Sequence, residues 1–212
     1  MTTKEILPQT LYIDKIKENK ILSDFYLDKF YENFYKIPIL SRDWDIHTDF
    51  HEPHLEEDFA SLKIQEIDYC LAKSIYIKYI EKFLSLSFPE IDMDSVKIED
   101  IWYNVYGKGQ EAKLHDHSGA SFSLVHYLKY EKSEHQAIEF VDKLNVKRFS
   151  PEIEEGDIIM FPSNMRHRVE PSKSNKLRVS LAMNVSIYGH DLLSEDKNEG
   201  KTTKEIISLE NA

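Results

Sequence analysis

The sequence predicts an α+β domain in which helices cover one face of a β-sandwich of the jelly-roll type. Residues 55–88 carry apolar side chains at helical spacing. Beyond Val96 the pattern changes to short strand-like segments separated by turn signals. A helical first half followed by many short strands is typical of an α+β domain with its helices on one side of the sheet.

Two helical regions are expected before Pro89. Residues 23–35 are predicted to form a helix with Ser23 as its N-cap. Residues 55–88 are predicted to form one or two long helices that end before Pro89, because the residue preceding a proline disfavours the helical conformation. Turn signals then divide the second half into strands, and they lie at 107–109, 118–119, 150–151, 155–157, 162–164 and 172–175.

The strand predicted at 121–130 indicates where the helices and a cavity lie, because successive side chains on a strand point to opposite faces. One face carries Phe122, Leu124, His126, Leu128 and Tyr130, and the other carries Ser121, Ser123, Val125, Tyr127 and Lys129. We expect the first, more apolar face to pack on the helices. The second face should line a ligand cavity, with Tyr127 toward it and His126 away from it.

Composition narrows the class of protein. The 212 residues suit one domain with a substantial core. The single cysteine, Cys70, excludes an intramolecular disulfide and suits a reducing compartment. The sequence has no apolar run of membrane-spanning length and no signal-peptide pattern, so we expect a cytoplasmic protein without a membrane partner. The formal net charge of -11 argues against a nucleic-acid partner.

A set of ordered polar residues predicts a metal site beside a carboxylate anchor. His115 and His117 are one residue apart, so on a strand both side chains would share a face. His167, from another strand, can complete one face of an octahedral metal. Arg178 offers a planar fork of donors to a carboxylate, and Ser180 would share its strand face.

The order of these residues resembles the Fe(II)- and 2-oxoglutarate-dependent oxygenases, in particular their prolyl-hydroxylase-like branch. The resemblance covers roughly residues 102–184. Its segments are Tyr106-Gly107-Lys108-Gly109, His115-x-His117, Tyr127-Leu128, the run from Gly156 to Pro162, His167 and Arg178-x-Ser180.

The resemblance implies a double-stranded β-helix, which is a jelly-roll, cupin-like fold. Residues 1–94 would then be a helical support region of the same domain, residues 95–188 the catalytic β-helix core, and residues 189–212 a C-terminal tail. The oligomeric state does not follow from the sequence.

The resemblance also implies a ligand set. Iron would be bound by His115, His117 and His167, with no catalytic residue beyond the metal site. His117 stands where the family usually has Asp or Glu, so the native metal is left open, and Asp116 is a reserve ligand that a β-bulge could turn inward. The co-substrate 2-oxoglutarate would be held by Arg178, Ser180, Tyr127 and Tyr106.

Two functions are therefore considered. The first is a dioxygenase that hydroxylates a C–H bond of a peptide or small molecule, with a peptidyl proline as the leading candidate, and releases succinate and carbon dioxide. The alternative is a cupin-like three-histidine metal protein, either an oxoglutarate-independent dioxygenase or a small-molecule binding module. Arg178 discriminates between them, because only the first function requires it.

Overall fold

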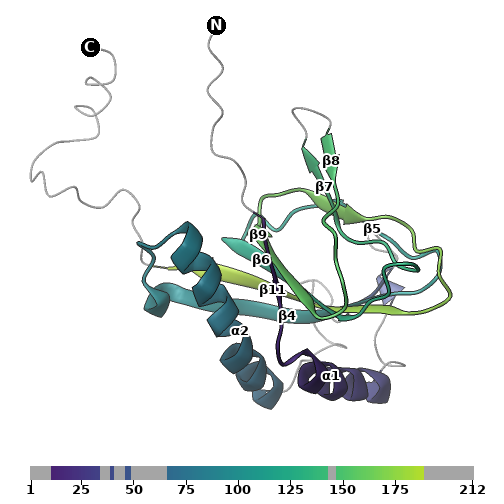
Figure 1. Cartoon of the computed structure of the whole chain (residues 1–212), viewed down its shortest axis with the longest axis horizontal. Coiled ribbons are helices and arrows are strands. Elements are labelled where there is room, and N and C mark those ends of the chain that lie inside the picture. Colours follow the sequence, from purple (N-terminus) through teal and green to yellow (C-terminus); the bar gives the residue numbers. More distant parts are fainter. Residues whose placement is uncertain (1–10, 34–38, 41–45, 49–65, 143–146, 189–212) are drawn as a thin grey trace, which may run out of the picture.

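The computed structural model describes residues 11–33, 39–40, 46–48, 66–142 and 147–188. Within these ranges the chain forms two α-helices and two antiparallel sheets, so the predicted α+β class is confirmed (Figure 1). The predictions for residues 55–65 and for the tail at 189–212 lie outside the described residues. None of the helices in the described part combines the length and apolar character needed to cross a membrane.

The helices differ from the prediction at one end. Helix α2 spans Glu66–Ser87 and ends before Pro89, as predicted. Helix α1 spans Asn19–Asn33 and begins four residues earlier than predicted. Ser23 is therefore not an N-cap: its hydroxyl donates a hydrogen bond to Leu128 O at 3.1 Å, so it joins the helix to a strand. A short 3₁₀ helix, η3, follows at Met93–Ser95.

The larger sheet has seven strands in the order β1-β9-β6-β11-β4-β3-β2, and the smaller has four in the order β5-β10-β7-β8. The strands of the larger sheet are β1 Tyr12–Lys15, β2 Ile39–Leu40, β3 Ile46–Thr48, β4 Val96–Tyr106, β6 Phe122–Lys129, β9 Asp157–Pro162 and β11 Arg178–Ile187. Those of the smaller sheet are β5 Ala112–His115, β7 Glu139–Asp142, β8 Lys147–Phe149 and β10 His167–Val169.

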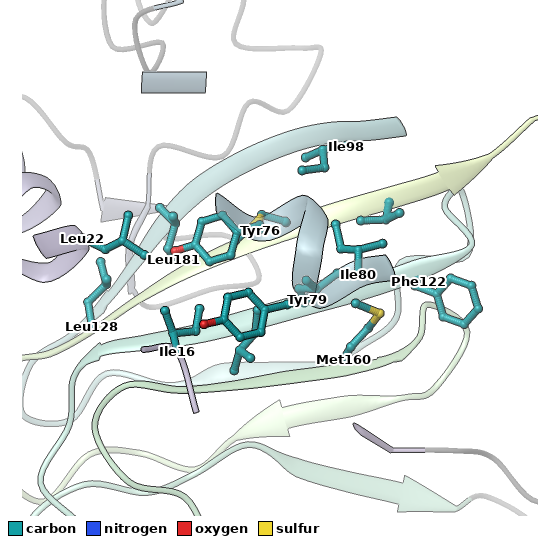
Figure 2. Packing of buried hydrophobic residues seen from close by; sticks show 14 of the residues in the cluster. Ile16, Leu22, Tyr76, Tyr79, Ile80, Ile98, Phe122, Leu128, Met160 and Leu181 are labelled. Carbon is teal, nitrogen blue, oxygen red and sulfur yellow. The ribbon is translucent and has the colours of Figure 1, made fainter. Parts of the chain in front are cut away.

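Both helices pack on the outer face of the larger sheet, on the side away from the smaller sheet (Figure 1). Figure 2 shows Tyr76, Tyr79 and Ile80 of α2 among apolar side chains of the strands. Phe122 and Leu128 of β6 belong to this cluster, as the strand pattern predicted. Burial of these side chains contributes on the order of 1.5–3 kcal/mol each and fixes which face of the sheet remains for a site.

A second apolar cluster lies between the two sheets. Phe140 of β7 contacts Phe161 of β9 with ring centroids 4.9 Å apart, which joins the layers. Tyr127 lies in this cluster, as predicted. The prediction for Tyr130 was wrong: β6 ends at Lys129, and Tyr130 turns inward, where its ring lies 5.1 Å from that of Tyr127.

His126 faces the helices, away from the inter-sheet space, as predicted. Its Nδ1 lies 2.6 Å from the Tyr76 hydroxyl and its Nε2 lies 2.8 Å from Asn19 Oδ1. Because the amide oxygen only accepts, Nε2 carries the proton and Nδ1 accepts from the tyrosine. Complete burial lowers the pKa of His126 to about 3, so the ring is neutral. This hydrogen-bonded bridge joins both helices to β6.

Candidate metal centre

Three histidine rings meet at the inner face of the smaller sheet. The ligand atoms that His115, His117 and His167 can offer all lie within 4.8 Å of one another. His115 of β5 and His167 of β10 are directly opposite in the antiparallel ladder, with ring centroids 4.2 Å apart. Cross-strand neighbours have closely spaced side chains, so this pairing brings two rings from distant parts of the sequence together.

His117 reaches the cluster by a different route from the one predicted. Strand β5 ends at His115, so the two histidines do not share a strand face and that part of the prediction was wrong. Residue 117 lies in the following loop, where its backbone N–H donates to Ser163 O at 2.8 Å. The loop held by this bond places the His117 ring 5.1 Å from that of His115 and 5.3 Å from that of His167.

Asp116 points away from the histidine cluster. Its side chain is exposed, and Oδ1 accepts hydrogen bonds from the backbone N–H and the hydroxyl of Ser118. Among the described residues the group of potential metal ligands contains the three histidines and no carboxylate. This geometry supports the three-histidine set over Asp116, although the ligand assignment stays a prediction.

Backbone carbonyls fix the tautomer of two of the three rings. His115 Nδ1 lies 2.6 Å from Lys113 O, and His167 Nδ1 lies 2.9 Å from Met165 O. A carbonyl oxygen accepts, so Nδ1 donates in both rings and Nε2 of each keeps its lone pair. Backbone bonds of this kind are the usual means of orienting metal-binding histidines.

The three rings are held neutral. Burial, followed by the nearby His115, lowers the pKa of His117 to about 4. Burial is also the largest cause of the lowered pKa of His115 and of His167. A metal binds the neutral ring, so the cluster suits a divalent cation at neutral pH.

A cavity between the sheets connects this cluster to Arg178. Its wall includes the three histidines and Arg178, and further side chains that line it are Trp102, Asn104, Tyr106, Ser123, Ser180 and Ala182. Trp102 and Asn104 were not among the predicted site residues. On β4 they precede Tyr106 by four and two residues, and this even spacing is the signal that places them on the same strand face.

Arg178 is a buried cation with unused hydrogen-bonding capacity. It is 3% exposed, and Nη1 donates to Gln136 O at 3.0 Å. Its Nε is buried without a hydrogen-bond partner, and no carboxylate of the described residues forms an ion pair with the guanidinium. A buried charge of this kind is costly unless it is paired, so the cavity is suited to an anion.

Two tyrosines hold the guanidinium in place. The carbon centre of Arg178 lies 4.5 Å from the Tyr106 ring centroid and 5.0 Å from that of Tyr127. Burial raises the pKa of Tyr106 to about 12, so its phenol keeps the proton and can donate. The Tyr127 hydroxyl accepts from Ile138 N at 3.3 Å, so this residue contacts Arg178 through its ring.

Ser180 lies opposite Asn104 in the β4–β11 pairing. Its hydroxyl donates to Asn104 O at 3.4 Å, which is a long contact that the O–H can exchange for an acceptor in the cavity. All four predicted co-substrate residues therefore lie around or against one cavity, although their role stays a prediction.

Residues 137–184 match the family described as "Putative 2OG-Fe(II) oxygenase", a segment that includes His167 and Arg178. A comparison with curated protein sequences finds no match.

Several solved structures share the fold. A Pseudomonas putida prolyl-4-hydroxylase is 13% identical, with a TM-score of 0.58 over 85% of this chain and 94% of that one. The viral collagen prolyl hydroxylase of Paramecium bursaria Chlorella virus-1, in its 2-oxoglutarate complex, is 17% identical, with a TM-score of 0.51 over 82% and 95% of the two chains. The α-ketoglutarate-dependent epimerase SnoN of nogalamycin biosynthesis is 11% identical, with a TM-score of 0.61 over 92% and 87%.

Over residues 137–184 the chain matches the model of the 2-oxoglutarate- and iron(II)-dependent oxygenases, and its fold is the one that these solved structures share, in agreement with the resemblance found in the sequence. The double-stranded β-helix that this recognition implied is the fold of these neighbours. An oxygenase is therefore the class of enzyme that the partial family match supports, and the histidine cluster and the buried arginine suit the expected cofactors, iron(II) and 2-oxoglutarate.

Proposed function

We propose that this chain hydroxylates a C–H bond of a peptide, with a peptidyl proline as the leading substrate, and couples the reaction to conversion of 2-oxoglutarate into succinate and carbon dioxide. The observation that carries the proposal is the placement of Arg178, a buried cation without a carboxylate partner among the described residues, in the same cavity as the three histidines.

In this proposal iron(II) is held by His115, His117 and His167. When bound, the metal supplies the oxidising chemistry that amino-acid side chains lack. Three ligands on one face leave further coordination positions for the co-substrate. The chain contributes neutral imidazoles in a cavity between the two sheets.

Arg178 receives the distal carboxylate of 2-oxoglutarate. Its free Nε and its stacked, fixed guanidinium suit a charge-assisted contact with little reorganisation. Tyr106 and Ser180 line the same wall and offer hydroxyl groups to that carboxylate without adding charge. The neutral triad and the single arginine leave this cavity positive overall, as a dianionic co-substrate requires.

A peptide is favoured over a small molecule as the substrate. Two of the neighbours are prolyl hydroxylases by name, and the segments at Tyr106 and Tyr127 resemble that branch. The epimerase neighbour carries the same fold with a different reaction, so the fold alone does not choose the substrate.

The experiment measures succinate from purified protein given iron, ascorbate, oxygen and 2-oxoglutarate. We expect slow uncoupled succinate release from the wild type, loss of it in Arg178→Ala, and retention in the matched control Arg148→Ala, whose side chain is largely exposed. Proline-containing peptides should then gain one oxygen atom by mass spectrometry. Succinate without a modified peptide would keep the class of enzyme and discard the proline substrate.

The three-histidine set favours one alternative, a cupin-like metal protein that does not use 2-oxoglutarate. This alternative predicts no change in melting temperature when 2-oxoglutarate is added with a redox-silent divalent metal. The oxygenase predicts a rise, since a ligand at about a hundred times its dissociation constant adds about 2.7 kcal/mol.

A further inference from the structure

A second, wider cavity adjoins the histidine cluster. Its volume is about 450 Å³, and His117 forms part of its wall as well as part of the wall of the first cavity. The other residues around it are Glu99, Asp100, Asp116, Ser118, Gly119, Ala120, Asn184 and Ser186. No lysine or arginine is among them, whereas the first cavity contains Arg178.

One face of β11 contributes side chains to the walls of both cavities. Arg178, Ser180 and Ala182 line the first, and Asn184 and Ser186 continue the same two-residue spacing along the second. A hydrogen bond of 3.2 Å from Ser123 Oγ to Asn184 Oδ1 lies at the junction, because Ser123 lines the first cavity and Asn184 the second. The proposed co-substrate anchor and the second cavity therefore lie at opposite ends of one strand face, with the metal ligands beside it.

A β-bulge concentrates carboxylates on the second cavity. Asn184 pairs with Asp100 and Val185 pairs with Ile98, so Glu99 is the extra residue in the β4–β11 pairing. Consecutive residues on a regular strand face opposite sides, but Glu99 and Asp100 both line this cavity. Bulges of this kind redirect side chains, often next to active sites.

The carboxylates of Glu99 and Asp100 differ in their contacts with the rest of the chain. Glu99 is already engaged by Lys97 at 3.0 Å and by the Tyr188 hydroxyl, and these contacts lower its pKa. Asp100 is exposed, and its carboxylate forms neither a hydrogen bond nor an ion pair with any described residue. Asp116, the third carboxylate at this wall, accepts hydrogen bonds from Ser118, so Asp100 is the carboxylate least engaged by the chain and most available to a ligand.

A buried amide provides an independent indication of a ligand. Asn184 is 8% exposed, and its Oδ1 is used by Ser123, whereas its Nδ2 makes no hydrogen bond to any residue in the described part of the chain. An amide N–H that faces a cavity needs an acceptor such as a peptide carbonyl or water.

We propose that the second cavity binds the substrate and selects a peptide that carries a lysine or arginine close to the oxidised residue. This inference rests on the proposed hydroxylase function, because the cavity matters as a substrate site only if the adjoining centre oxidises that substrate. Asp100 pairs with the cationic side chain, and the Asn184 amide donates to a carbonyl of the peptide backbone.

The test uses the full chain, immobilised with a redox-silent divalent metal and 2-oxoglutarate. A degenerate mixture of capped heptapeptides, with a central proline and randomised flanking positions, is passed over it, and mass spectrometry compares the retained peptides with the input. We expect lysine and arginine to be enriched about three- to tenfold and acidic residues to be depleted. The enrichment should fall in about 0.5 M salt, which screens such pairs.

Three variants complete the test. Asp100→Asn should lose most of the enrichment, and Asp100→Lys should abolish it. Glu90→Gln, which removes the same charge at an exposed position outside the cavity, should behave as the wild type. Melting temperatures verify that each variant is folded.

Failure of this inference is distinguishable from failure of the proposed function. Retention of peptides without basic enrichment, no retention at all, or enrichment that is unchanged in Asp100→Lys would overturn the cationic substrate site. Uncoupled succinate production is measured in parallel on the wild type and does not depend on the peptide, so its presence or absence decides the oxygenase function separately.

Discussion

His115 and His167 face each other across the β5–β10 ladder with ring centroids 4.2 Å apart, and both direct Nδ1 to a backbone carbonyl. The pairing of two short strands therefore fixes two candidate metal-binding rings in the same tautomer. The third ring, His117, is added by a loop that Ser163 anchors. Backbone hydrogen bonds thus help to position all three rings.

The first prediction concerns the ligand set. His115→Ala, His117→Ala and His167→Ala should remain folded but lose most bound iron, because each removes one of three facial ligands. Iron content per chain, measured by elemental analysis after equilibration, provides the readout. Asp116→Ala is the control and should bind iron as the wild type does. If His117→Ala bound iron normally and Asp116→Ala lost it, the third ligand would be Asp116 and not His117.

The second prediction concerns His117 alone. His117→Asp restores the ligand type that the oxygenase family usually has at this place, and it should retain the metal. A carboxylate removes one unit of positive charge from the centre, so the preference should move toward harder cations. Competition between iron and zinc in the wild type and the variant measures this. An unchanged preference would indicate that residue 117 is not a ligand.

The third prediction concerns pH. Burial depresses the pKa of His126 to about 3, whereas the unfolded chain has an ordinary value near 6.5. Between pH 6.5 and about 3, His126 is therefore protonated in the unfolded chain but not in the folded one. The free energy of unfolding decreases as the pH falls through this range. The loss is up to about 1.4 kcal/mol per pH unit.

Denaturant unfolding of the wild type and of His126→Gln at pH 7 and pH 5 measures this contribution. The variant should be less stable at pH 7, because the Tyr76 and Asn19 contacts are disturbed, but its stability should fall less on acidification. Equal pH dependence in the two proteins would contradict a buried neutral His126.

The fourth prediction uses three glycines as a series. Gly156 has φ of 86°, and an added Cβ would lie 2.9 Å from the Asn19 side chain. Gly109 has a φ of 82° but open space around it, and Gly119 has neither constraint. Gly109→Ala should cost on the order of 1–2 kcal/mol of unfolding free energy, and Gly156→Ala should cost more because Asn19 must also move. Gly119→Ala should change the free energy of unfolding little. Denaturant unfolding measures all three variants, and a loss in Gly156→Ala no larger than that in Gly109→Ala would contradict the predicted clash with Asn19.

Much of the fold could be predicted because local patterns determined it. Pro89 stops α2, and the alternation along β6 placed Phe122 and Leu128 under the helices and Tyr127 on the inner face. The start of α1 was missed because Ser23, a good N-cap residue, bonds instead to Leu128, 105 residues away in sequence. Such a partner is invisible in a local pattern.

The site was predictable as a set of residue types and less so as a geometry. The order of His115, His167 and Arg178 indicated the site, because histidines suit a metal ion and an arginine suits a carboxylate. The loop position of His117 depends on pairing with Ser163, and the acidic second cavity depends on a bulge at Glu99. Both features follow from strand register, which the sequence specifies only through long-range contacts.

The account depends most on Arg178 as the anchor of 2-oxoglutarate, and calorimetric titration of 2-oxoglutarate into protein loaded with a redox-silent divalent metal tests this directly. Removing one partner of a buried charge pair costs on the order of 3–5 kcal/mol, which is a hundredfold or more in affinity. We therefore expect clear binding by the wild type and by Arg148→Ala, and loss of that affinity in Arg178→Ala with the metal retained. Equal affinity of the wild type and Arg178→Ala for 2-oxoglutarate would contradict the central claim.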